Sequence, residues 1–115
     1  MNKIRLVINN ESKKNEKEKF FIKKELQSIL NLYAKMVSNG SWKDYSFTSG
    51  IKEVSFDVYQ RASEKPVLRI LKNLKPRYFD EKYLIKDKNG AILKKSENLN
   101  QLISKTSWNK LKLVK

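Results

Sequence analysis

The chain has 115 residues, a length that suits one domain and leaves little room for two. It contains no cysteine and no histidine, which excludes disulfides, thiolate catalysis, Cys-type zinc sites and histidine general bases. With 26 basic and 12 acidic residues, its formal net charge is +14. We therefore expect polyanionic partners, meaning nucleic acid, anionic lipid or an acidic protein.

The basic charge has a second interpretation, because most of the basic residues are Lys. Lys, Asn and Ile are the residues that an AT-rich genome over-uses. Codon bias accounts well for Lys in place of Arg, and less well for the shortage of acidic residues. Both interpretations, a functional basic surface and compositional drift, stay open from the sequence, since charge bears on partners and not on fold.

The first 19 residues are predicted to be a flexible charged arm, followed by a single α+β domain over residues 20–115. Residues 3–8 alternate weakly and indicate a short strand, whereas residues 9–19 are wholly polar and charged. No segment has the roughly 20 apolar residues of a membrane span, and no run resembles a signal peptide. We therefore expect a cytoplasmic protein without a membrane span.

The clearest predicted element is a helix over residues 22–38. Asn39 and Gly40 end it, since Gly readily takes the left-handed conformation after a helix. No polar capping residue stands just before Ile22. Helical spacing places one apolar face toward the core, made of Ile22, Leu26, Ile29, Leu30, Tyr33, Met36 and Val37.

After Gly40 the apolar period changes from 3.6 to 2, which is typical of half-buried strands. Tyr45 and Phe47 alternate with polar residues, and the same pattern continues beyond residue 53. Residues 53–72 are predicted to form an antiparallel hairpin, because the connection at 61–66 is too polar for a core and contains a Pro.

The last third of the chain predicts a hairpin, a helix and a strand. Asn89-Gly90 between two apolar runs indicates a type I′ hairpin turn. Ser96 is predicted to cap a short helix over 97–105, whose core-facing residues are Leu99, Leu102 and Ile103. Alternation at Leu111 and Leu113 predicts a closing strand. The fold class is therefore α+β: a long N-terminal helix packed on an antiparallel sheet of about five strands, then a short C-terminal helix and a closing strand.

Three segments also carry a resemblance to a known family: Glu25 to Tyr45, Val54 to Lys72, and Asn89 to Lys95. Their most specific parts are Leu32-Tyr33, Met36-Val37, Gly40, the run from Trp42 to Tyr45, and the loop from Arg61 to Pro66. In these parts the chain resembles an uncharacterised alphaproteobacterial family, domain of unknown function 2794, over most of residues 21–105. Ile22 departs from the polar capping residue that we expect in the family. The family brings no known activity, so the resemblance implies the limits of the folded region and no function.

No motif in the chain predicts catalysis, a metal or a cofactor. The three glycines are not grouped as a phosphate-binding loop or a dinucleotide fingerprint requires. Asp57, Asp80 and Glu81 lack the spacing of a metal-ligand set. We therefore expect a non-enzymatic binding module.

The candidate binding surface consists of Trp42, Lys43, Tyr59, Arg61, Glu64, Lys65, Arg69, Lys75, Arg77 and Lys88. Trp42 beside Lys43 indicates either base stacking or an aromatic cover for the end of the first helix, and the second is favoured because small cores need large aromatic side chains. Arg61 and Glu64 indicate either a loop site or an ion pair that shapes the turn.

The predicted hairpin adds two further features to this surface. If Val54, Phe56 and Val58 point inward, then Tyr59, Arg61 and Arg69 point outward, as on an RNA- or single-strand-binding sheet, or as on an ordinary solvated face. If the loop that holds Lys75 and Arg77 folds against the hairpin that holds Lys88, they form one basic patch.

These observations lead to three ranked hypotheses. The first is a module that binds DNA or RNA mainly through phosphates, with weak sequence specificity. The second is a protein-interaction adaptor that docks an acidic partner or self-associates through an edge strand. The third, a small enzyme or ligand-binding domain, ranks last because His and Cys are missing.

Overall fold

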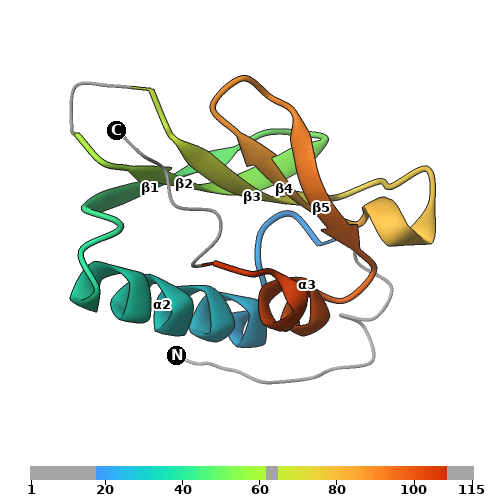
Figure 1. Cartoon of the computed structure of the whole chain (residues 1–115). Helices are drawn as coiled ribbons and strands as arrows, with labels where there is room; N and C mark the ends of the chain where they lie inside the picture. Colours follow the sequence, from blue (N-terminus) through green and yellow to red (C-terminus); the bar gives the residue numbers. More distant parts are fainter. Residues whose placement is uncertain (1–17, 62–64, 109–115) are drawn as a thin grey trace, which may run out of the picture.

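A computed structural model describes residues 18–61 and 65–108, which form two α-helices and a five-stranded antiparallel sheet (Figure 1). The elements in chain order are α2 (Lys23–Ser38), β1 (Asp44–Ser49), β2 (Glu53–Tyr59), β3 (Leu68–Asn73), the 3₁₀ turn η1 (Phe79–Glu81), β4 (Tyr83–Asp87), β5 (Ile92–Ser96) and α3 (Leu99–Lys105). The strands lie in sequence order, so each is joined to the next by a hairpin or a short connection. The α+β prediction is confirmed. The predicted strands at 3–8 and 111–113 lie outside the described residues, as does nearly all of the arm.

Both helices cover the same side of the sheet, as Figure 1 shows. Alternation along the strands turns every second side chain toward them. Phe56 in the middle of β2 stands opposite Phe47 on one side and Ile70 on the other, and β4 continues the row with Ile85. Phe56, Ile70 and Ile85 are fully buried. The inward orientation predicted for Val54, Phe56 and Val58 follows from this register.

Helix α2 begins one residue later than predicted and ends where predicted, and its predicted apolar face is confirmed in part, since Ile29 and Met36 are buried. Its buried residues are Glu25, Ile29, Leu32 and Met36. Three residues predicted to be in the core, Ile22, Leu30 and Val37, are instead 42%, 38% and 39% exposed. The physical reason is that α3 lies on the Leu32 side of α2, where Ser28 donates a hydrogen bond to Asn100 at 2.7 Å. The face of α2 that packs on the core is therefore turned toward Leu32 and away from Leu30 and Val37.

The ends of α2 follow the sequence prediction in part. Ile22 is the N-cap, and its backbone N–H donates to Oε1 of Glu25 at 2.8 Å, so a residue inside the helix replaces the missing polar cap. Gly40 follows the helix with φ of 83°, the left-handed conformation that was predicted.

The β4–β5 hairpin forms where it was predicted, but with a longer loop. The N–H of Asp87 donates to the carbonyl of Ala91, and the N–H of Gly90 donates to the carbonyl of Asp87, both at 3.0 Å. This pattern encloses three loop residues with Gly90 at φ of 87°, and so the predicted two-residue type I′ turn is wrong. The side chain of Asp87 selects the longer loop, since Oδ1 accepts from the N–H groups of Asn89 and Ala91 at 2.9 Å.

Helix α3 begins two residues later than predicted and has another cap. Oδ1 of Asn98 accepts from the N–H of Gln101 at 2.9 Å, whereas Ser96 accepts from the N–H of Asn98. The predicted inner face of this helix is confirmed for Leu99 and Leu102, which are buried.

Candidate nucleic-acid interface

Basic residues from three separate segments meet at one end of the sheet. Lys43 directly precedes β1, Arg61 and Lys65 lie in the β2–β3 loop, and Lys86 and Lys88 lie at the end of β4 and just after it. The order and antiparallel register of the strands place these segments side by side, since the first residue of β3 pairs with the last residue of β4. We call these five residues the basic end.

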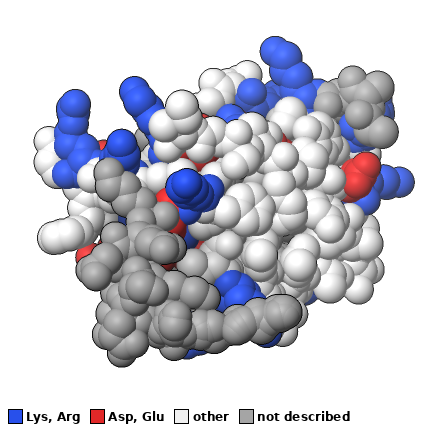
Figure 2. Space-filling model, turned by 180° about the vertical axis from the view of Figure 1, so that it is seen from behind, with Lys and Arg blue, Asp and Glu red and all other residues white. Residues whose placement is uncertain are grey.

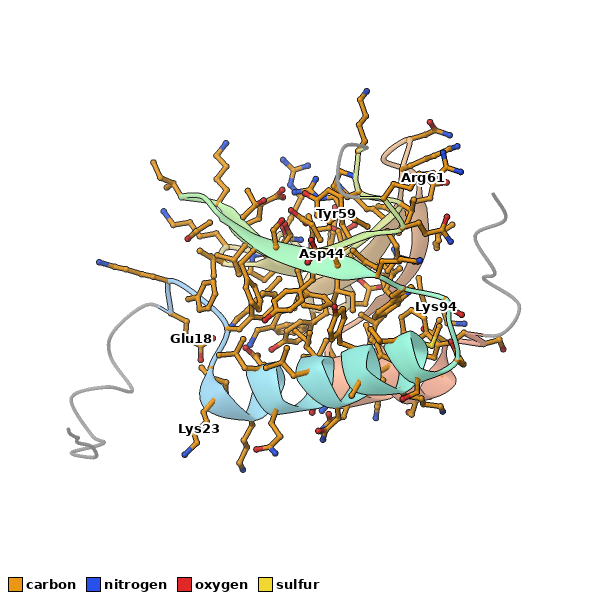
Figure 3. The ribbon with its side chains drawn as sticks, turned by 90° about the vertical axis from the view of Figure 1, so that its left-hand side faces the viewer. Glu18, Lys23, Asp44, Tyr59, Arg61 and Lys94 are labelled. Carbon is orange, nitrogen blue, oxygen red and sulfur yellow. The ribbon has the colours of Figure 1, made fainter. Side chains whose placement is uncertain are left out.

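The basic end extends onto the side of the sheet that the helices do not cover. Figure 3 shows Tyr59 and Arg61 standing on this side, away from α2. In the space-filling view of Figure 2, Lys and Arg side chains stand mainly along the upper rim, on the same helix-free side, while the middle of the view is largely uncharged. These basic side chains stand at both ends of the rim (Figure 1 and Figure 2), so their gathering on the helix-free side is not confined to the basic end.

Two described carboxylates at the basic end, Asp44 and Asp87, accept hydrogen bonds from backbone N–H groups. Oδ1 of Asp44 accepts from the N–H of Tyr45 at 2.8 Å, and Asp87 holds the hairpin loop through two N–H groups. Within residues 18–61 and 65–108, no ion pair involves Lys43, Lys65, Lys86 or Lys88. Lys43, Lys65 and Lys88 are exposed and Lys86 is half-buried, so within these ranges four lysines of the basic end have no carboxylate partner.

A buried polar cluster stabilises the same face of the sheet next to the basic end. Asp57, which is 3% exposed, accepts hydrogen bonds from Thr48 at 2.6 Å, Ser55 at 2.7 Å and Nε of Arg69 at 2.9 Å. Arg69 also donates from Nη2 to Ser55 at 2.9 Å. The guanidinium group of Arg69 thus binds Asp57 and Ser55 of the neighbouring strand, and its role is structural.

Two aromatic residues of the predicted binding surface, Trp42 and Tyr59, also have partners within the protein. Trp42 is 3% exposed, and its ring lies edge-on to Trp108 at 5.8 Å between centroids. It therefore covers the end of α2, in agreement with the favoured interpretation, and is closed to a base. The Tyr59 hydroxyl is 3.1 Å from the Ser46 hydroxyl.

The remaining predicted residues divide between the two ends of the sheet. Lys75 and Arg77 are exposed in the β3–β4 connection, which leaves the sheet at the end opposite to Lys88. The loop folds against β5 near Lys95, as predicted for the hairpin lysines nearest to it, but the length of β4 separates Lys75 and Arg77 from Lys88 at the other end of the sheet. The loop contacts the sheet through an exposed ion pair, Lys95 with Asp80 at 3.6 Å, and through Asn73, whose backbone N–H donates to the carbonyl of Lys82 at 2.8 Å. Glu64 lies outside the described residues.

A second charged cluster, which sequence analysis missed, is buried between α2 and the sheet. Nζ of Lys72 lies 2.8 Å from Oε1 of Glu25, 2.6 Å from Glu18 and 3.0 Å from the carbonyl of Phe20. The Tyr83 hydroxyl donates to the other oxygen of Glu25. Burial, together with the hydrogen bond to Glu25, raises the pKa of Tyr83 above its usual range.

The sequence did contain a signal for this cluster. Continuing the alternation of β3 inward from Ile70 places Lys72 on the buried face. A buried ammonium group needs a paired carboxylate, and Glu25 is three residues after the N-cap position, where acidic residues are common. All three Lys72 donors have partners within the protein, so the cluster serves the fold.

The part of the chain that the structure describes contains no group of side chains suited to hold a metal ion. Neither α2 nor α3 is long and apolar enough to span a bilayer.

Comparison with known proteins supports the predicted resemblance. The family model described as "Protein of unknown function (DUF2794)" matches residues 19–103. The chain belongs to this family. The DUF2794 match contains α2, all five strands and the whole basic end. No curated protein and no solved structure matches the chain.

Proposed function

We propose that this DUF2794 protein is a non-enzymatic module that binds nucleic acid through the basic end of its sheet. The observation that carries the proposal is the convergence of Lys43, Lys65, Lys86 and Lys88, which have no carboxylate partner among the described residues, next to the exposed Arg61. Neighbouring cations at one end of a sheet create the local positive potential that attracts a polyanion.

The mode of binding is contact with phosphates. Trp42 is buried and Arg69 is bound to Asp57, so the stacking and bidentate contacts that would read bases are weakened at this surface. Lysine ammonium groups act as point charges toward phosphate oxygens and carry little sequence information. The protein should therefore bind many sequences with similar affinity, and its affinity should fall steeply with salt.

Labelled DNA and RNA oligonucleotides, single- and double-stranded, can be titrated at several salt concentrations by fluorescence anisotropy. A double variant of the basic end, Lys65→Gln with Lys88→Gln, should weaken binding and lower the salt slope by about 0.7–0.9 for each phosphate that is no longer neutralised. The matched control is Lys75→Gln with Arg77→Gln, which removes the same charge from the opposite end of the sheet and should leave the slope unchanged.

Two results would contradict the proposal. One is an absence of binding at low salt, or binding that does not depend on salt. The other is equal weakening by both double variants, since this would assign the affinity to net charge and not to the basic end.

A further inference from the structure

The two edges of the sheet differ in how they are protected against another strand. The β5 edge carries Lys94 and Lys95, and a register shift interrupts its pairing with β4 at Ile85 and Lys86. Charged side chains and bulges are the usual guards of an exposed edge. The β1 edge has the sequence DYSFTS over Asp44–Ser49, with one charged residue and no register shift against β2.

On its outer side, the backbone of β1 has no strand partner among the described residues. In the described chain β1 pairs with β2 alone. Antiparallel pairing turns the N–H and C=O groups of alternate residues outward. Tyr45 belongs to this set because its N–H donates to the side chain of Asp44 and not to β2, and an added strand would take the place of this local hydrogen bond. Phe47 and Ser49 share the same orientation, so a strand could add along this edge.

An uncharged flank of α2 lies beside this edge. Tyr33 turns toward β1, where the centroid of its ring lies 4.8 Å from the ring centroid of Tyr45. Helical spacing puts Leu30 and Val37 on the same side of α2 as Tyr33. Leu30, Val37 and Tyr45 are 38%, 39% and 38% exposed. After Lys23, the residues on this side of the helix are uncharged, although charged residues make up 33% of the chain. Figure 3 looks onto this side of the molecule, with β1 and α2 in front.

We propose that this β1–α2 flank binds a second copy of the chain, related by a two-fold axis. The argument for a second copy is that β1 is complementary to itself. With the axis at Ser46, Tyr45 of each copy stands opposite Phe47 of the other, and Asp44 stands opposite Thr48. This register joins outward-facing backbone groups, forms two cross-strand aromatic pairs and opposes no like charges. It also packs the exposed apolar residues of the two α2 helices along a continuous ten-stranded sheet.

The charge of the protein makes a distinctive prediction for this dimer. Two chains of formal charge +14 repel one another, and salt screens that repulsion. Since the flank has one charged residue, Asp44, which the proposed register places opposite the uncharged Thr48, added salt should strengthen the dimer, whereas it should weaken the proposed nucleic-acid binding. The two surfaces adjoin at Lys43 and Asp44, but the opposite salt dependences allow the two proposals to fail separately.

Sedimentation equilibrium of the nuclease-treated full chain, at high micromolar concentration and two salt concentrations, tests the proposal. We expect twice the 13.6 kDa chain mass, with tighter association at the higher salt. Leu30→Lys and Val37→Lys, made separately, should each shift the protein to the monomer, with folding checked by circular dichroism. Leu93→Lys is the matched control, because Leu93 is also 38% exposed but lies on β5, and it should remain dimeric.

Several outcomes would overturn the proposal. A wild-type chain that stays monomeric at both salt concentrations would do so, as would a dimer that Leu93→Lys dissociates and the α2 variants do not. A full chain that is monomeric but dimerises after removal of residues 1–17 would show that the chain's own N-terminal segment occupies the edge.

Discussion

Replacing Lys72 with Met should destabilise the protein more than any change at its surface. The ammonium group is 1% exposed and its three donors are directed at Glu25, Glu18 and the Phe20 carbonyl. Glu18 can turn to water because it is 46% exposed, but Glu25 is 8% exposed and stays buried. Removing one partner of a buried ion pair typically costs about 3–5 kcal/mol, a large part of the roughly 5–15 kcal/mol that stabilises a small domain.

The assay is urea denaturation followed by circular dichroism, with the free energy of unfolding taken from midpoint and slope. Adding Glu25→Gln to Lys72→Met removes the stranded charge while keeping an oxygen for the Ile22 N–H, so the double variant should be more stable than Lys72→Met alone. Lys95→Met, which breaks an exposed pair, is the control and should cost about 0–1 kcal/mol. Equal losses for Lys72→Met and Lys95→Met, or a double variant as unstable as the sum of its single variants, would refute the reasoning.

Three further predictions follow from the packing. The pKa of Tyr83 is raised in the folded state, so the Tyr83 hydroxyl contributes fully to stability below the ordinary tyrosine pKa of about 10, and this contribution is lost as pH rises above that value. Tyr83→Phe should therefore flatten the fall of the unfolding free energy at alkaline pH. An unchanged pH profile would contradict this prediction. Trp42→Ala should cost about 3–5 kcal/mol in urea denaturation while leaving nucleic-acid affinity of the folded protein unchanged, and a selective loss of affinity would show that the ring contacts the ligand after all. Gly90→Ala should cost about 1–2 kcal/mol, because a Cβ there meets no atom within 4 Å but φ is +87°; a neutral effect in the same assay would show that the loop adopts another conformation.

The sequence predicted those features of the fold that depend on local periodicity. The change of period after Gly40 correctly separates α2 from the sheet, and the alternation of Val54, Phe56 and Val58 fixes which face of β2 is buried. The burial stripe of α2 was right for Ile29 and Met36 and wrong for Leu30 and Val37, because two apolar stripes overlap on this helix. Choosing between Leu30 and Leu32 requires the position of α3, which is a tertiary property.

The candidate site depends on strand order even more strongly. Lys65 and Lys88 were predicted separately, but only the register of β3 with β4 brings their loops together. The same order moves Lys75 and Arg77 to the opposite end of the sheet. Arg69 was correctly predicted to lie on the outer face of the sheet. It is bound to Asp57, its neighbour across the β2–β3 pair, and so has a structural role in place of the predicted binding role.

The most direct test of the proposed function is to locate the nucleic acid on the chain by amide chemical shifts. A short single-stranded oligonucleotide is titrated into ¹⁵N-labelled protein at low salt, and the shifts are mapped by residue. The account predicts changes concentrated at Lys43, in the loop containing Arg61 and Lys65, and from Lys86 to Ala91. Shifts centred on residues 74–82 or on the helices, or a spectrum that does not change, would contradict it.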